Sequence, residues 1–211
     1  MGIKRYTADS DTTITNAFAS SLLERSRGTG SNMGASDVVE VFSIYDQGQP
    51  GYLKSIDDRG DPSSGSVELT RALVKFPISD VSTARTNGDI PASGSVNFYL
   101  RMFNAKHAHT LPRDFKLVIS PVSQSWEEGT GLDMEGYKDI GTSNWVNRIA
   151  SRSAGDHAWA STGGDYFSDA SSSFTASFDS GVEDIELDIT PLVEQWVNSA
   201  GNILGSKEEE G

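Results

Sequence analysis

The fold is indicated most clearly by the stretch Ile185-Glu186-Leu187-Asp188-Ile189, in which two acids separate three apolar residues. Successive side chains of a β-strand point to opposite faces, so this spacing gives one apolar and one charged face. Four further stretches read as strands, namely residues 38–45, 67–76, 95–103 and 115–119. The first of these is apolar at nearly every position, whereas the other three alternate for most of their length. Half-buried segments of this kind, bounded by turn residues, are typical of antiparallel sheets.

One helix is expected directly after this stretch. Thr190 suits the N-cap position, and Pro191 suits the first helical position, where its missing N–H costs nothing. The residues that follow place an apolar stripe on one face of the helix, formed by Leu192, Val193, Trp196 and Val197. Two weaker candidates are a short helix or turn over residues 79–81 and a helix over residues 15–27.

Many short strands, long loops and one short helix near the C-terminus predict an all-β fold. We expect an antiparallel β-sandwich of the jelly-roll type. Its interior is expected to be filled by large apolar side chains from the strands and the helix: Leu69, Leu73, Phe98, Leu100, Leu117, Ile119, Leu187 and Trp196.

The composition is acidic and lacks cysteine. In 211 residues, Lys+Arg 17 stand against Asp+Glu 30, a net charge of −13. This balance argues against a nucleic-acid partner, which needs a dense basic patch. The absence of cysteine excludes disulfides, thiolate catalysis and cysteine-containing zinc sites. No apolar run approaches the ~18 residues of a membrane span, and no secretory signal follows Met1, so we expect a chain made in a cytoplasm.

An acidic, glycine-rich stretch offers a candidate calcium site. Glu127, Glu128, Asp133 and Glu135 crowd this stretch, with Asp139 just beyond it. Calcium takes six to eight oxygen ligands, which such a loop supplies, although the spacing matches no EF-hand. The alternative, a solvated acidic loop, is the interpretation that we favour, and we expect neither a metal nor any other cofactor.

The three histidines give little support for catalysis. His107 and His109 would share one side of a strand, as zinc ligands do, but the sequence indicates no third ligand. His157 follows Asp156, and neighbours in sequence rarely form a catalytic dyad. No nucleophile elbow of the form Gly-x-Ser-x-Gly is present. A glycosidase would need two carboxylates at a fixed separation, which no pattern indicates. We expect no enzyme.

Several aromatic residues have two interpretations. Large aromatics fill protein interiors, and exposed ones stack on sugar rings. Trp196 lies on the helix stripe and Trp126 ends a strand, so both are expected in the core. Trp145 and Trp159 lie in polar surroundings and suit either role. Together with two tyrosines they form the candidate glycan-stacking set: Tyr99, Trp145, Trp159 and Tyr166.

Several segments resemble the DNRLRE-type domain, a jelly-roll sandwich related to carbohydrate-binding modules. Residues 71–78 are similar to its R-x-L-L-x-F-D-L strand, and residues 95–102 stand at its A-x-L-x-L-Y strand. Residues 118–128 resemble its V-x-x-V-x-x-x-W-x-E segment, and residues 188–196 its closing D-V-T-x-L-V-x-x-W signature. Two shorter matches are Asn32-Met33-Gly34, at its N-x-G after the first strand, and Asn144-Trp145, near its later Trp-Asn region.

The opening residues 3–18 resemble virion structural proteins of contractile-tailed phages that infect marine cyanobacteria, which carry the same sandwich. This resemblance implies a protein assembled in the bacterial host cytoplasm and located in the virion. Phage particles leave by lysis, so their proteins need no secretory signal.

Two departures from the DNRLRE pattern affect the expected domain organisation. The family has a further strand after the tryptophan-containing helix, whereas this sequence reaches Gly211 in an acidic loop or tail at 206–211. Either a partner supplies that strand or the native chain continues, and we favour the second. Residues 15–30 have no counterpart in the family. We therefore expect an N-terminal strand and docking arm over 1–30 and a jelly-roll sandwich over 31–205.

Two functions follow from these observations. The first is a non-enzymatic virion structural protein of the capsid, neck or tail, which packs against other virion proteins and copies of itself. The alternative is a carbohydrate-binding module or adhesin that recognises a host-surface glycan through the exposed aromatics.

Overall fold

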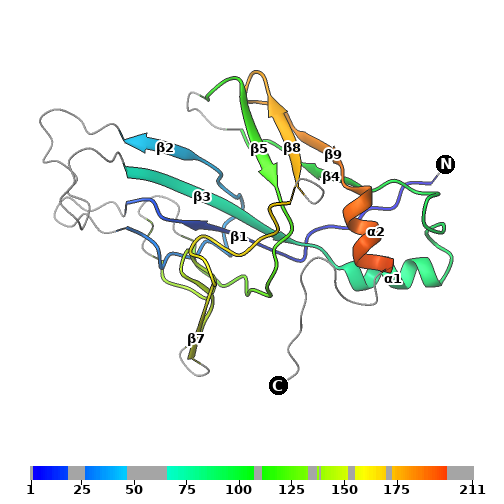
Figure 1. Ribbon diagram of the computed structural model, residues 1–211, viewed down its shortest axis with the longest axis horizontal. Coiled ribbons are helices and arrows are strands. Elements are labelled where there is room, and N and C mark those ends of the chain that lie inside the picture. The colour runs from blue at the N-terminus through cyan, green and yellow to red at the C-terminus, as the bar shows by residue number, and fades with distance from the viewer. Residues whose placement is uncertain are drawn as a thin grey trace, which may run out of the picture. The chain divides into compact units, whose positions relative to one another are not determined.

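The structure is a computed structural model, shown in Figure 1. It describes residues 2–18, 27–46, 66–106, 111–132, 137, 139–151, 155–169 and 173–198. The chain divides into two compact units. Unit 1 consists of Met1–Thr7, Phe76–Ser125 and Asp165–Gly211, and unit 2 of Ala8–Lys75 and Trp126–Gly164. Strands predominate and 12% of the chain is helical, which confirms the all-β class. Within the described ranges, neither helix is long and apolar enough to cross a membrane.

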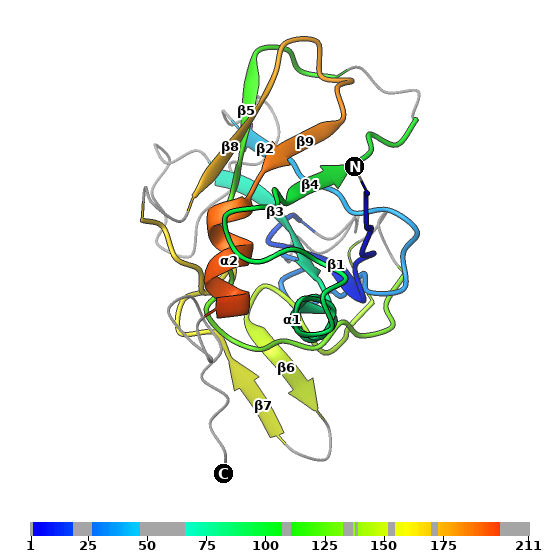
Figure 2. The same ribbon diagram turned by 90° about the vertical axis from the view of Figure 1, so that its right-hand side faces the viewer.

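Unit 2 is built on a three-stranded antiparallel sheet in the order β1-β3-β2. Strand β3 (Ser66–Lys75) pairs through its second half with β1 (Ser10–Thr15) and through its first half with β2 (Ser43–Asp46). Strands β6 (Asn147–Ser151) and β7 (Gly155–Ala158) form a separate hairpin, visible in Figure 2.

Strand β1 is buried on both faces although three of its four innermost residues are threonines. Thr12, Thr13, Ile14 and Thr15 are all inaccessible to solvent. The hydroxyl of Thr12 accepts the N–H of Met33 at 3.4 Å, and that of Thr13 accepts the N–H of Glu40 at 2.9 Å. Buried hydroxyls are tolerated because they are hydrogen-bonded, so β1 attaches the following loop to the sheet.

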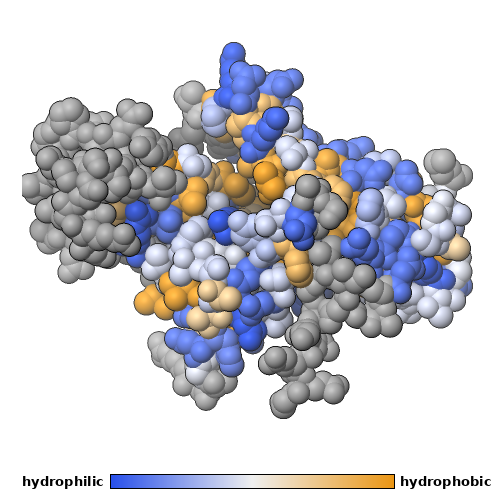
Figure 3. Space-filling model, viewed as in Figure 1, coloured by the Kyte–Doolittle hydropathy of each residue, from blue (hydrophilic) through white to orange (hydrophobic). Residues whose placement is uncertain are grey.

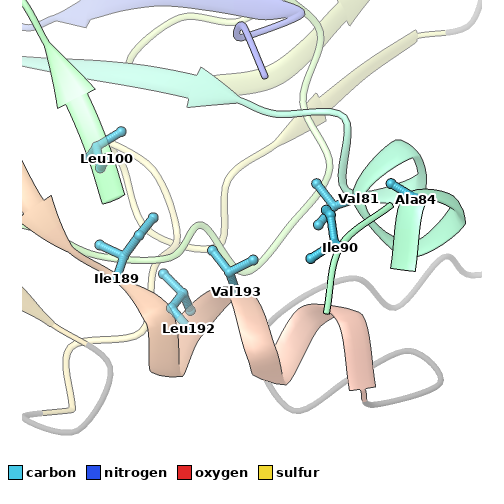
Figure 4. Packing of buried hydrophobic residues seen from close by; sticks show 7 residues of the cluster. All are labelled: Val81, Ala84, Ile90, Leu100, Ile189, Leu192 and Val193. Carbon is cyan, nitrogen blue, oxygen red and sulfur yellow. The ribbon is translucent and has the colours of Figure 1, made fainter. Parts of the chain in front are cut away.

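Unit 1 contains two strand pairs and both helices. Strand β4 (Tyr99–Met102) pairs with β9 (Ile185–Asp188), and β5 (Phe115–Ile119) pairs with β8 (Phe174–Phe178), all antiparallel. Helices α1 (Ile78–Thr86) and α2 (Thr190–Asn198) join these strands around an apolar cluster, shown in Figure 4. The cluster consists of Val81, Ala84, Ile90, Leu100, Ile189, Leu192 and Val193.

The strand predictions are confirmed where apolar residues alternate. Residues 115–119 form β5, and their side chains alternate between half-buried and exposed. Residues 95–103 are strand only over β4, and the apolar stretch 38–45 is strand only from Ser43. Of the eight residues expected in the core, Leu73 and Leu100 are buried, and the other six are half-buried.

The helix predictions fared unequally. The turn after Pro77 extends into the nine-residue helix α1, and the expected helix near the C-terminus is α2. The hydroxyl of Thr190, expected to cap α2, instead accepts the N–H of Phe98 at 2.7 Å, next to strand β4. The helix expected over residues 15–27 is wrong at both ends, because Thr15 belongs to β1 and Phe18 forms a β-bridge with Arg27. Residues 19–26 lie outside the described part.

Candidate functional site

Asn32 is a fully buried polar residue of unit 2, and its side chain organises the site. Its Nδ2 donates to the carbonyl oxygens of Glu128 at 2.7 Å and Ser143 at 2.8 Å. Its Oδ1 accepts the N–H groups of Gly34 at 3.2 Å and Gly131 at 2.9 Å. The side chain therefore makes four hydrogen bonds to the backbone, one within its own turn and three to segments about a hundred residues further along the chain. We call these residues and the glycines around them the Asn32 cluster.

Glycine is required where the acidic stretch passes Asn32. A Cβ atom at Gly131 would lie 1.9 Å from the carbonyl oxygen of Asn32, closer than any real contact. At Gly129 a Cβ would lie 2.3 Å from Oδ1 of Asn32, and this residue has a φ of +84°. Both observations explain why the stretch is rich in glycine: it wraps closely around a buried amide.

Glu128 is part of this cluster through its carboxylate as well as its backbone. Its Oε1 accepts the N–H of Asp11 at 2.8 Å, which ties the stretch to β1. Burial, and to a lesser extent the negative charge of Glu128, raise the pKa of the Asp11 carboxyl. The carboxylates of Asp11 and Glu128 therefore lie close together, and that of Glu128 already accepts a backbone hydrogen bond.

The candidate calcium ligands are only partly covered by the described residues. Glu127 is exposed, and its N–H donates to the carbonyl oxygen of Arg148 at 3.2 Å. Asp133 and Glu135 lie outside the described residues. Oδ2 of Asp139 accepts the N–H of Leu132 at 2.8 Å. Among the residues that the structure describes, no three acids or histidines come together in a group that could hold a metal ion.

One of the three histidines, His157, lies within the described residues. His157 is exposed on β7, next to Asp156. Side chains of adjacent strand residues point to opposite faces, which separates this imidazole from its neighbouring carboxylate. His107 and His109 lie outside the described residues.

The two tryptophans with two interpretations are both buried. Trp145 is 7% exposed and Trp159 is 5% exposed, so neither indole offers a free face to a sugar ring. The Nε1 of Trp159 donates to the carbonyl oxygen of Asn144 at 2.9 Å. The guanidinium of Arg71 lies 5.2 Å from the centre of the Trp145 ring, a cation–π contact. The structure thus supports the interior role for both indoles. Their neighbours in the sequence are polar, but residues from distant parts of the chain, such as Arg71, also contact them.

The two tyrosines of the stacking set are exposed. Tyr99 is 53% exposed on β4, and Tyr166 is 47% exposed where it forms a β-bridge with Val122. Both belong to unit 1. Trp126 and Trp196, expected in the core, are half-buried.

Two carboxylates of unit 1 have notable partners that the sequence pattern did not indicate. The carboxylate of Glu194 on α2 binds the guanidinium of Arg85 on α1 through two bonds of 2.7 and 2.8 Å. Hydrogen bonds from Arg85 lower the pKa of this carboxyl. Glu183 accepts bonds from the hydroxyl and N–H of Ser180 and from the N–H of Gly181, and these lower its pKa to about 2.

These polar residues hold structure together. Glu183 closes the turn between β8 and β9, Glu194 joins two helices, and Asn32 joins three loops. For Asn32 a signal was present in the Asn32-Met33-Gly34 motif and in the glycines that it contacts. For the Arg85–Glu194 pair no local signal exists, because the partners are separated by more than a hundred residues.

Comparisons with known proteins returned no match. No family model matches the chain, and neither a curated protein nor a solved structure does.

Proposed function

We propose that this chain is a non-enzymatic structural protein of a phage particle and acts by packing against neighbouring subunits, copies of itself included. The observation that carries the proposal is the Asn32 cluster. The acidic, glycine-rich stretch passes closely around the buried side chain of Asn32, whose donors and acceptor are all satisfied by backbone groups of the same chain. Such a cluster fixes loop shape, which a protein that works through its surface requires.

The finer architecture belongs to the same proposal. We infer that the strand pairs form an antiparallel sandwich of the jelly-roll type. The antiparallel pairing of β1–β3–β2, β4–β9, β5–β8 and β6–β7 supports this inference. The alternating exposure along β5 and β9 also supports it, since one face of each strand is covered and the other is open.

The proposed location is the virion, after assembly in the host cytoplasm. The net charge of −13 favours solubility and docking on basic patches of neighbouring virion proteins, and it disfavours nucleic acid. The proposal involves no cofactor and no membrane.

Mass spectrometry of purified particles from the phage that encodes this chain tests the proposal. Peptides of the chain should copurify with the major virion proteins through a density gradient, at a constant ratio between fractions. Peptides confined to the unassembled lysate, and absent from particles that contain the other structural proteins, would overturn the proposal.

Glycan recognition is the second candidate, and one observation favours it: the aromatic residue Tyr99 is 53% exposed on a strand. A glycan array with the wild-type chain and Tyr99→Ala tests this function. Binding to a defined glycan that is lost in Tyr99→Ala and kept in Val118→Ala, an exposed control on β5, would establish it. Trp159→Ala is unsuitable for this test, because a buried indole also stabilises the fold.

A further inference from the structure

One edge of strand β4 has backbone groups available for pairing. The N–H of Ile189 donates to the carbonyl oxygen of Phe98 at 2.9 Å, and the register continues with Leu100 opposite Leu187. In an antiparallel pair, alternate residues face the partner strand, so Leu100 and Met102 bond toward β9. The backbone groups of Tyr99, Arg101 and Phe103 therefore point to the opposite edge. In the described parts of the chain, β4 pairs only with β9 (Figure 2).

The side chains of the same three residues are exposed. Tyr99 is 53% exposed and Phe103 is 72% exposed, the latter among the most exposed large apolar residues of the described chain. Between them, Arg101 lies 5.6 Å from the centre of the Phe103 ring and pairs with Glu186 at 3.0 Å. Apolar side chains reach the surface at several places, as Figure 3 shows, but here they accompany an open strand edge.

The sequence of this edge reads alike in both directions. Tyr99-Leu100-Arg101-Met102-Phe103 is aromatic, aliphatic, basic, aliphatic and aromatic around Arg101. A two-fold axis at Arg101 would place Tyr99 opposite Phe103 and Leu100 opposite Met102 of the other copy, so that residues of matching type meet. We propose that β4 pairs edge to edge with β4 of a second copy of this chain, with the two-fold axis at Arg101.

This register satisfies both the backbone and the side chains. Tyr99 lies opposite Phe103 of the other copy, twice, and aromatic cross-strand pairs stabilise a sheet by ~0.2–1 kcal/mol each. The N–H and C=O groups of Tyr99, Arg101 and Phe103 all find partners. The two Arg101 side chains meet at the axis, where like charges repel, and the carboxylate of Glu186, 3.0 Å from the guanidinium in each chain, offsets part of this repulsion.

The interface is small. Five residues from each copy bury far less than the roughly 1,200–2,000 Å² typical of stable complexes. We therefore expect a weak dimer for the isolated chain, strengthened where many copies are held in one assembly. An open strand edge that is used in this way is also protected from indiscriminate pairing.

Disulfide trapping tests the register, because the chain has no cysteine of its own. In the proposed dimer the Cα atoms of the two copies of residue 101 lie about 5.5 Å apart, within the range that a disulfide spans. Arg101→Cys should therefore cross-link under mild oxidation at least tenfold faster than Lys116→Cys, an exposed control on β5. Equal rates for the two variants would overturn the proposal. Thermal unfolding of both variants verifies that each retains the fold.

A second pair of variants fixes the alignment of the strands. Tyr99→Cys mixed with Phe103→Cys should give a mixed dimer, because these positions face each other in the proposed register. Each variant alone should cross-link slowly, since its two cysteines would be four residues apart along the strands, ~13 Å. Equally fast cross-linking of each variant alone would overturn the register.

This inference names a partner within the proposed function and rests on it for its biological role. The two are separable by experiment. Chain peptides in purified particles together with slow cross-linking of Arg101→Cys would overturn the β4 pairing and leave the structural role intact. Rapid cross-linking of Arg101→Cys with no chain peptides in particles would support the β4 pairing and overturn the structural role in the particle.

Discussion

Replacing Asn32 with aspartate should destabilise unit 2 strongly at neutral pH, with almost no change in side-chain size. The substitution keeps the acceptor of Gly34 and Gly131 but converts the donor Nδ2 into an oxygen. That oxygen would then lie 2.7–2.8 Å from the carbonyl oxygens of Glu128 and Ser143. Each carbonyl left without its donor costs ~1–3 kcal/mol, so the loss is about 2–6 kcal/mol before any cost of burying the charge. Native domains are stable by only ~5–15 kcal/mol.

Urea unfolding followed by tryptophan fluorescence measures this loss, because Trp145 and Trp159 are buried in unit 2 and report on its unfolding. The pH dependence has a definite sign. Burial raises the pKa of the new carboxyl at position 32, and its protonated form donates one hydrogen bond again. The difference from wild type at the same pH should therefore be largest at pH 7 and should shrink as the pH falls toward 4.

The matched control is Asn97→Asp, the same chemical change at an exposed position of unit 1, which should shift stability by less than ~0.5 kcal/mol. If Asn32→Asp unfolds at the same urea concentration as wild type, the hydrogen bonds of the Asn32 cluster do not hold these loops. A loss that is equal at pH 7 and pH 4 would show that packing, not the donor, is responsible.

Three further changes test other contacts. Glu194→Gln should lower the stability of unit 1 by ~1.5–3 kcal/mol at pH 7, because it weakens two charged hydrogen bonds with Arg85. The side chains of this pair are each 14% exposed, and an unchanged melting temperature would contradict the prediction. Since Arg85 lowers the pKa of Glu194, the effect should fade as the pH drops below the usual glutamate range. Asp11→Asn should raise the melting temperature at pH 7, where the folded state holds a carboxylate whose pKa is raised by burial and by Glu128, and the gain should vanish near pH 3. The turn closed by Glu183, whose pKa is lowered to about 2, should hold above pH 4.5 and loosen as the pH falls from 4.5 to 2; an NMR titration of its carboxyl with a midpoint near 4.5 would refute this.

The strands that the sequence predicted best are those whose pattern depends on near neighbours alone. Residues 115–119 alternate because one face of β5 is covered, so five consecutive residues are enough to predict the strand. The prediction of a strand over residues 38–45 was wrong for the first half, because apolar composition does not specify a partner strand. Val38 and Val41 are exposed, and strand pairing begins only at Ser43. Hydrophobicity indicates what favours burial, whereas the register with a distant strand decides what is buried.

The candidate site could be predicted only in part for the same reason. Threonine is more often exposed than buried, and the burial of the β1 threonines depends on N–H groups of Met33 and Glu40, about twenty to thirty residues away. The surroundings of Trp145 look polar in sequence, yet Arg71 covers its ring from another part of the chain. The acidic stretch suggested a cation site, and its glycines in fact leave room for Asn32. In each case the deciding contact is non-local.

The distribution of polar and aromatic groups bears on where recognition takes place. Unit 2 buries the polar side chain of Asn32, whereas unit 1 exposes Tyr99 and Phe103 beside an edge of β4 with which no described strand pairs. A buried amide whose four bonds are all made within the chain has none left for a ligand, so its effect on function has to pass through loop shape. An open strand edge has directional donors and acceptors as well as apolar area, and both are needed for a specific contact. A protein with this division should lose folding when its interior polar groups change and lose association when its edge changes. Asn32→Asp and Arg101→Cys address these two consequences separately.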